Sequence, residues 1–291
     1  MPRPRTARPL QRMILRVFVI LVLASAIFGA CWFAVYELYI KPEQQLHADK
    51  ALPPPTPPPD PSLADFTKCV EIHRTGNKAE SRAALEQFLR EYPASSKRDG
   101  AYDMLGEINA AEFFAMKPTD ENTYVVRSGD SLQRVAGRTK VSVELLTYLN
   151  RIDGRYLHPN QRLIAPPSAF RLIIQQRSRR VVLHNGDKFF RQYPAAEWPG
   201  VGKQVIRPKQ AGRVSEKRAF DSTGSIPPSQ LRYFGAYHII LVNIPGCSLH
   251  TQPNDPKAVI ERPPGGGIGL APEHMNEIAI LLPSGAPVSM E

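Results

Sequence analysis

Cys247 and His250, three residues apart, are the side chains of this chain best suited to covalent chemistry. A thiolate next to an imidazole is a general arrangement for acyl transfer, because the imidazole accepts the thiol proton and the sulfur then attacks a carbonyl carbon. The two residues lie in a strand-like run, and an odd separation on a strand sends side chains to opposite faces. The sequence therefore favours an inert thiol. An enzyme using Cys247 and His250 is the alternative, and it needs a bulge or turn at Pro245-Gly246.

The other cysteines and histidines show no spacing typical of metal ligands or of a disulfide framework. Cys31 and Cys69 fall in segments of different character, and no other histidine stands at ligand spacing from an acid or a cysteine. We therefore predict no metal site and no cofactor.

A second set of polar residues lies between Tyr124 and Pro166. The turn sequence Ser128-Gly129-Asp130 separates a short β-prone run from two segments with apolar residues at helical spacing, and Leu163-Ile164-Ala165 closes the stretch. Asp130 or Ser131 can cap the first helix, and Gly129 suits a turn that needs a positive φ. The pattern predicts the order β-α-α-β.

This stretch resembles the LysM domain, which binds glycans containing N-acetylglucosamine, chiefly peptidoglycan and chitin. The resemblance implies a shallow groove between the turn after the first strand and the loop after the second helix. A module kept only for packing explains the same residues, because glycine, aspartate and serine also suit any turn into a helix and Asn150 suits a helix end. The residues that match the LysM pattern are Tyr124, Val126, Gly129, Asp130, Ser131, Leu132, Val135, Ala136, Leu146, Asn150, Leu157, Asn160, Gln161, Leu163 and Pro166. The groove residues that it implies are Gly129, Asp130, Ser131 and Leu132 on one side and Asn150, Arg151, Ile152 and Asp153 on the other.

The segments before this module predict a membrane anchor and a spacer. Residues 1–16 carry five arginines and no acid, and residues 17–40 begin with a run of about 20 apolar residues, enough for a helix to span a bilayer. The positive-inside rule then predicts a cytoplasmic basic tail, a single pass through the inner membrane, and a chain that is otherwise periplasmic or extracytoplasmic. A signal peptide cleaved at Ala24-Ser25-Ala26 is the alternative. Residues 41–61 are rich in proline and predict an extended linker.

Residues 62–117 have apolar side chains at helical spacing and resemble tetratricopeptide-type hairpins, which usually bind partner proteins. That resemblance implies a cell-wall protein partner. A small helical spacer that packs on its neighbour explains the pattern equally well.

Residues 168–291 change to a strand pattern and predict a mainly-β, sandwich-like domain with one short helix from Glu273 to Leu281. The frame resembles L,D-transpeptidases, with Leu249-His250-Thr251 at the place of the family's I-H-G-T-P. The family's S-H-G-C-I-R-L falls on residues 264–270. Gly267 then stands at the position of the nucleophilic cysteine, Gly269 at that of the arginine, and Pro264 and Gly265 at those of the Ser-His pair. Glycine cannot be acylated through a side chain, so the resemblance implies a degenerate domain with a vestigial His250.

These patterns predict a multidomain α+β chain. It would combine a transmembrane helix, a helical hairpin segment at residues 62–117, a βααβ LysM domain at residues 123–167 and a mainly-β L,D-transpeptidase-like sandwich at residues 168–291. We expect a membrane-anchored cell-envelope protein that binds peptidoglycan and carries an inactive domain as a scaffold or regulator of cell-wall remodelling. We expect no enzyme activity. We also expect no nucleic-acid partner despite the net charge of +10, because most of the chain would lie on the exported side of the membrane. The alternative is a divergent L,D-transpeptidase that crosslinks peptidoglycan with Cys247 and His250.

Overall fold

The computed structural model describes residues 8–41, 60–154, 156–199, 209–252 and 267–291. The chain divides into two units, Met1–Pro59 and Asp60–Glu291. Most of the expected linker and the first seven residues of the expected basic tail lie outside the described residues.

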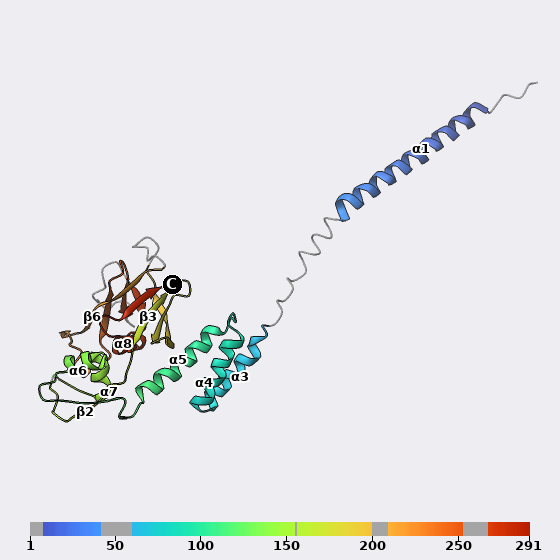
Figure 1. Ribbon diagram of the computed structural model, residues 1–291. Helices are drawn as coiled ribbons and strands as arrows, with labels where there is room; N and C mark the ends of the chain where they lie inside the picture. The colour runs from blue at the N-terminus through green and yellow to red at the C-terminus, as the bar shows by residue number, and fades with distance from the viewer. Residues whose placement is uncertain (1–7, 42–59, 155, 200–208, 253–266) are drawn as a thin grey trace, which may run out of the picture. The chain divides into compact units, whose positions relative to one another are not determined.

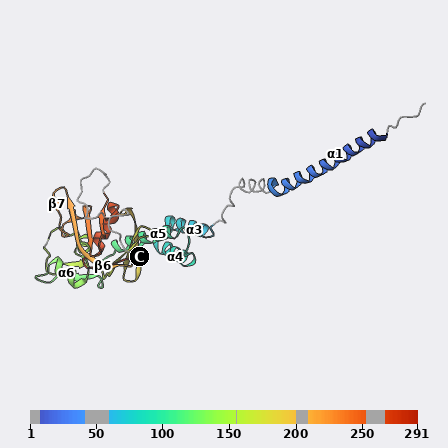
Figure 2. The same cartoon turned by 90° about the horizontal axis from the view of Figure 1, so that it is seen from above.

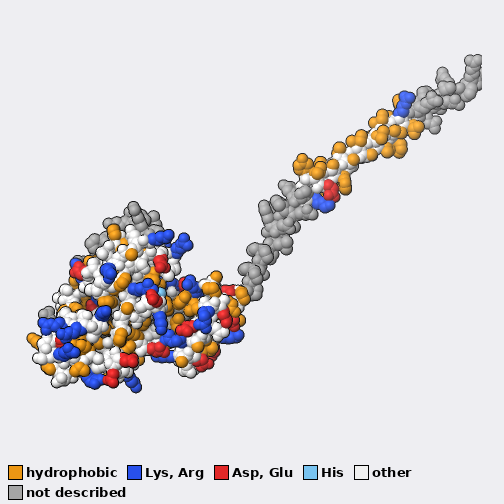
Figure 3. All heavy atoms as spheres, in the orientation of Figure 1, with side chains coloured by type: hydrophobic (Ala, Val, Ile, Leu, Met, Phe, Trp, Pro, Cys, Tyr) orange, Lys and Arg blue, Asp and Glu red, His pale blue; other side chains and the backbone are white. Residues whose placement is uncertain are grey.

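The first unit contains one long apolar helix, α1 (Arg8–Val35), which continues into the π-helical turn η1 (Tyr36–Ile40) (Figure 1). The candidate membrane span runs from Met13 to Ile40, 28 residues with a mean hydropathy of 2.5, and none of its residues is buried in protein. Figure 3 shows hydrophobic side chains along this helix. The helix is long and apolar enough to cross a membrane, which suits either an anchor or a signal sequence.

Three helices open the second unit: α3 (Ser62–Thr75), α4 (Lys78–Glu91) and α5 (Arg98–Phe114). Leu85, Phe88 and Leu105 form the centre of a small core between them. Helix α5 also packs against strand β5 of the β-rich domain, where the Asn109 amide donates to the Phe190 carbonyl at 2.8 Å. Figures 1 and 2 both show the three helices beside the β-rich domain. The helical segment is therefore packed on its neighbour.

A small module follows, in the expected order β1 (Thr123–Val125), α6 (Leu132–Thr139), α7 (Val143–Asn150) and β2 (Arg162–Ile164). The two strands are antiparallel, with Tyr124 opposite Leu163. The apolar residues that recur at helical spacing point inward, and those fully buried are Leu132, Val135, Leu145, Leu146 and Leu163.

The β-rich domain forms a sheet in the order β11-β3-β4-β5-β10-β9-β8-β6-β7, and β11 also pairs with β6. The two longest strands, β5 and β6, belong to both halves: β5 pairs with β4 and β10, and β6 pairs with β8 and β11. Long strands of this kind join the halves of a sandwich at its corners. The elements are β3 (Phe170–Gln175), β4 (Arg180–Asn185), β5 (Lys188–Glu197), β6 (Ala211–Asp221), β7 (Gly224–Ser225), η2 (Leu231–Tyr233), β8 (Tyr237–Val242), β9 (Ser248–Thr251), β10 (Ile268–Leu270), α8 (Pro272–Leu281) and β11 (Pro287–Met290).

The module and the β-rich domain share one hydrophobic core, and polar contacts also join them. The Ser142 hydroxyl, just before α7, donates to the Ile280 carbonyl on α8 at 2.6 Å. Lys217 Nζ on β6 lies 2.7 Å from Glu144 Oε1 on α7, and both side chains are buried. The module is therefore packed onto the β-rich domain. The multidomain α+β architecture expected from the sequence is confirmed.

Candidate functional site

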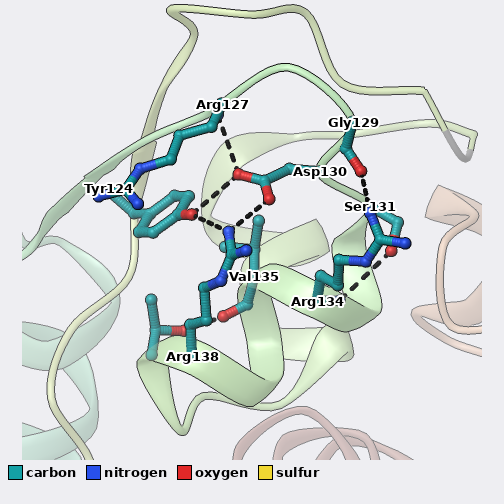
Figure 4. A network of polar contacts seen from close by, with 9 residues as sticks. Tyr124, Arg127, Gly129, Asp130, Ser131, Arg134, Val135 and Arg138 are labelled. Carbon is teal, nitrogen blue, oxygen red and sulfur yellow. Dashed lines mark hydrogen bonds and ion pairs between the residues drawn. The ribbon is translucent and has the colours of Figure 1, made fainter.

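Asp130 lies at the centre of a polar network in the turn between β1 and α6 (Figure 4). Its carboxylate accepts hydrogen bonds from the Tyr124 hydroxyl at 2.8 Å and the Arg127 amide at 2.9 Å, and it forms an ion pair with Arg138. The Arg127 amide, with the Tyr124 and Arg138 contacts, holds the pKa of Asp130 below its usual value. Asp130 therefore stabilises the shape of the turn as a charged acceptor.

Ser131, and not Asp130, caps α6. The Ser131 hydroxyl accepts a hydrogen bond from the Arg134 amide at 3.3 Å. Gly129 has φ +80°, as the sequence predicted, and its carbonyl accepts a hydrogen bond from the Arg134 guanidinium. The sequence left the cap open between two residues, and the structure assigns each a separate role.

The second wall of the groove predicted from the sequence begins at the end of α7. The Asn150 amide group donates to the Leu146 and Ile164 carbonyls, both at 2.9 Å, and its oxygen accepts from the Ile164 amide at 2.7 Å. Arg151 follows in the left-handed conformation, φ +50°, and ends the helix. The Asp153 carboxylate accepts a hydrogen bond from the Leu231 amide at 3.2 Å. Asn150 thus joins α7 to β2, and Asp153 joins this wall to the β-rich domain.

The eight predicted groove residues differ in what they can present to a ligand. Leu132 and Ile152 are buried, so their side chains belong to the core. Gly129, Arg151 and Asp153 are exposed, and Ser131 and Asn150 are half-buried. Asp130 is half-buried as a whole residue, but its carboxylate side chain is only 3% exposed. The sequence reasoning missed Arg138 as the partner of Asp130, because only the folded turn brings residues on β1, the turn and α6 together.

Residues 124–166 match the family model described as the LysM domain. This part of the chain is a LysM domain. The match spans 43 residues, and the order β1-α6-α7-β2 agrees with the order predicted above.

A second candidate site lies in the β-rich domain, between strands β9 and β10. The strands are parallel, with Leu249 opposite Ile268 and His250 opposite Gly269. A β-carbon added at Gly267 would lie 3.2 Å from His250 Nδ1 and 2.5 Å from Ser248 Oγ. Gly267 also has φ +111°, a conformation that side chains rarely adopt. His250 therefore faces a residue without a side chain, and the Ser248 hydroxyl fills the space where a side chain would begin.

His250 is buried, and its second ring nitrogen, Nε2, lies 3.7 Å from Glu197 Oε2. Ser248 and His250 are two residues apart on β9, so their side chains share one face of the strand. The imidazole thus has the Glu197 carboxylate near Nε2 and the place of the missing Gly267 side chain near Nδ1. The sequence reasoning missed Ser248, because its relation to Gly267 depends on the pairing of two strands.

Cys247 lies just before β9 and is 4% exposed. A turn does occur at Pro245-Gly246: Gly246 has φ +74°, and the Cys247 amide donates to the Ile244 carbonyl at 3.0 Å. The thiol belongs to the main hydrophobic core, and this burial raises the pKa of Cys247 to about 12. At neutral pH such a thiol is protonated, and a protonated thiol is a poor nucleophile.

Among the described residues, no group of three or more histidines, cysteines or acids could hold a metal ion.

The chain is also similar to solved structures of L,D-transpeptidases. L,D-transpeptidase 1 of Mycobacterium tuberculosis matches with 15% identity over 45% of this chain and 67% of that chain, with a TM-score of 0.27. The L,D-transpeptidase of Mycobacterium smegmatis matches with 14% identity over 61% and 88%, with a TM-score of 0.29. Another solved structure, Bd1075 of Bdellovibrio bacteriovorus, matches with 18% identity over 43% of this chain and 48% of that chain, with a TM-score of 0.30. Similarity at these identities and TM-scores does not indicate the activity of this chain. A comparison with curated proteins found no match.

Proposed function

We propose that this chain is a membrane-anchored cell-envelope protein that binds peptidoglycan through its LysM domain. In this proposal the β-rich domain is an L,D-transpeptidase-like domain without acyl-transfer activity, and it acts as a scaffold or regulator of cell-wall remodelling. The LysM match at residues 124–166 supports the glycan-binding half of the proposal. Of the eight groove residues named from the sequence, Leu132 and Ile152 have buried side chains, and Gly129, Arg151 and Asp153 are the most accessible.

One observation carries the proposal of an inactive domain. The position aligned with the family's nucleophilic cysteine is Gly267, and the β-carbon that it lacks would lie 3.2 Å from His250 Nδ1. Acyl transfer needs a nucleophile that forms a covalent intermediate, and a hydrogen atom cannot do so. The Ser248 hydroxyl also takes up the space in which a thiol would have to lie.

The helix α1 and the LysM domain together support the proposed localisation at the cytoplasmic membrane. An apolar helix near the N-terminus, preceded by arginines, suits a single pass with the N-terminus in the cytoplasm. Because peptidoglycan lies outside the cytoplasmic membrane, the LysM domain would then reach its ligand on the periplasmic or extracytoplasmic side. A cell-wall protein partner would bind the solvent-facing surface of helices α3–α5.

The alternative function is acyl transfer by Cys247 with His250. The turn at Gly246 favours this alternative, because the pair needs such a turn. The burial of the thiol and its pKa of about 12 oppose it, because little thiolate would form near neutral pH.

Two measurements on the full chain in nonionic detergent separate these functions. Sedimentation with purified peptidoglycan sacculi tests glycan binding, and intact mass after incubation with a carbapenem tests acylation. We expect sedimentation and no mass increase. A mass increase that disappears in Cys247→Ala, but persists in Cys69→Ala, would establish the enzyme instead. A chain that stays in the supernatant would overturn the glycan-binding proposal.

A further inference from the structure

Arginines outnumber acids on the turn that forms the first wall of the proposed groove. Arg127, Arg134 and Arg138 surround a single carboxylate, that of Asp130 (Figure 4). Arg138 forms the ion pair with Asp130 and so neutralises it. Within the described parts of the chain, no carboxylate lies within ion-pair distance of Arg127 or Arg134, and both residues are exposed. The turn therefore carries two positive charges that no acid of the described fold balances.

The position of Arg134 is set by the turn itself. Its guanidinium donates to the Gly129 carbonyl, which holds the group over the turn. A guanidinium has five N–H donors in a planar fork, so most of them remain for a ligand. Arg127 needs only its backbone amide for the Asp130 network, and its side chain is left to solvent. Both cations can therefore bind a ligand without breaking the network that shapes the turn.

The opposite wall adds a further cation. Arg151 is exposed, and no acid among the described residues pairs with it. Asp153 is the one acid among the four predicted residues of that wall, and its carboxylate already accepts the Leu231 amide. The second wall thus carries one cation and one anion, and the excess of positive charge lies on the first wall.

We propose that Arg127 and Arg134 bind carboxylate groups on the glycan, so that the LysM domain prefers peptidoglycan to neutral chitin. This inference depends on the proposed function, because it names the ligand of the same groove. The two polymers share N-acetylated sugars, but only peptidoglycan carries carboxylates. They lie on its stem peptides, and on the lactyl groups of those sugars whose stem has been removed. Arginine is well suited to them, because its planar fork pairs with both carboxylate oxygens.

The expected effect is moderate because the groups are exposed. Exposed ion pairs are weak, so two such contacts together amount to about tenfold in affinity and at most about 30-fold. The preference also depends on salt, because the screening length falls from about 8 Å at 0.15 M to about 3 Å at 1 M. A preference based on sugar contacts alone would change little with salt.

The test compares three probes with the full chain in nonionic detergent. Intact sacculi carry stem-peptide carboxylates, sacculi stripped by an amidase carry only lactyl carboxylates, and chitin carries neither. The variant is Arg127→Gln with Arg134→Gln, and Arg127→Gln alone is a second variant that keeps the Arg134 contact to Gly129. Arg177→Gln is the matched control, because Arg177 is an exposed arginine in the turn between β3 and β4. Circular dichroism and thermal melting confirm that each variant is folded.

At 0.15 M salt we expect the unmodified chain and the Arg177 control to bind sacculi about tenfold more tightly than chitin. The double variant should lose this preference, Arg127→Gln should lose part of it, and 1 M salt should weaken it in the unmodified chain. A preference that is lost on stripped strands identifies the stem-peptide carboxylates, and one that persists there shows that the lactyl carboxylates released by the amidase are also bound. Equal binding to sacculi and chitin, or a preference unchanged in the double variant, would overturn the inference and leave glycan binding intact. Binding to none of the three probes would overturn the proposed function itself.

Discussion

Lys217 and Glu144 form a buried ion pair that joins the LysM domain to the β-rich domain, and its removal is the sharpest test of how the two are coupled. Lys217 Nζ lies 2.7 Å from Glu144 Oε1, and the two side chains are 3% and 9% exposed. Lys217 Nζ also donates to the Ala279 and Leu282 carbonyls, at 2.8 and 2.7 Å. Burial lowers the pKa of Lys217, whereas the nearby Glu144 carboxylate favours its charged form. The ammonium group therefore depends on these three partners.

We expect Lys217→Met to lower the free energy of unfolding by about 3 to 5 kcal/mol, because it leaves a carboxylate buried without a cation. Methionine keeps the length of the side chain, so the loss arises chiefly from the charge and the hydrogen bonds. Glu144→Gln leaves the opposite charge and should also destabilise the chain. In the double variant no unpaired charge remains, so its loss should be about 1 to 2 kcal/mol, well below the sum of the single losses.

Urea denaturation of the full chain in nonionic detergent measures these free energies. Far-UV circular dichroism reports on the helices, and fluorescence of Trp198 reports on the β-rich domain if Trp32 is replaced by phenylalanine. The two signals should change together in the unmodified chain. A loss below 1 kcal/mol in Lys217→Met, or a double variant equal to the sum of the single variants, would refute the coupling.

Three further predictions concern single side chains. Asn150→Ala should destabilise the LysM domain by about 2 kcal/mol, because it leaves the backbone of Ile164 without its partners, and urea denaturation measures the loss. Burial lowers the pKa of His238 to about 4, so the unfolded chain binds this proton at higher pH than the folded chain does. Stability should be full above about pH 6.5 and fall by about 3 kcal/mol as the pH approaches 4, a loss that His238→Gln should remove. With the other two cysteines replaced by serine, Cys247 should resist alkylation at pH 8 in the folded chain and react once urea unfolds it.

Each of these predictions has an outcome that contradicts it. An Asn150→Ala variant as stable as the unmodified chain would show that water replaces the amide at β2. An equal acid dependence with and without His238 would assign the loss to other groups. Rapid alkylation of Cys247 in the folded chain would show a reachable thiolate and would favour the enzyme hypothesis.

The local features of the LysM domain could be predicted from the sequence, because they depend on neighbouring residues. Apolar spacing predicted α6 and α7, and the turn chemistry predicted the positive φ of Gly129. The hydrogen-bond partners of Asp130 and Ser131 could not be predicted in the same way. Asp130 and Ser131 were equal candidates for the cap, and their separate roles depend on Tyr124 and Arg138, which reach the turn only when β1 and α6 are folded against each other.

In the β-rich domain, the sequence alone determined that a glycine stands at position 267 and that a histidine and a cysteine lie near each other at 250 and 247. Only the tertiary structure placed Gly267 against His250 and put the Ser248 hydroxyl into the intervening space, because this contact depends on the register of two parallel strands. The same holds for Lys217 and Glu144, whose pairing depends on the packing of α7 against β6. Spacing along a chain predicts elements and their faces, whereas contacts between distant elements depend on how those faces pack.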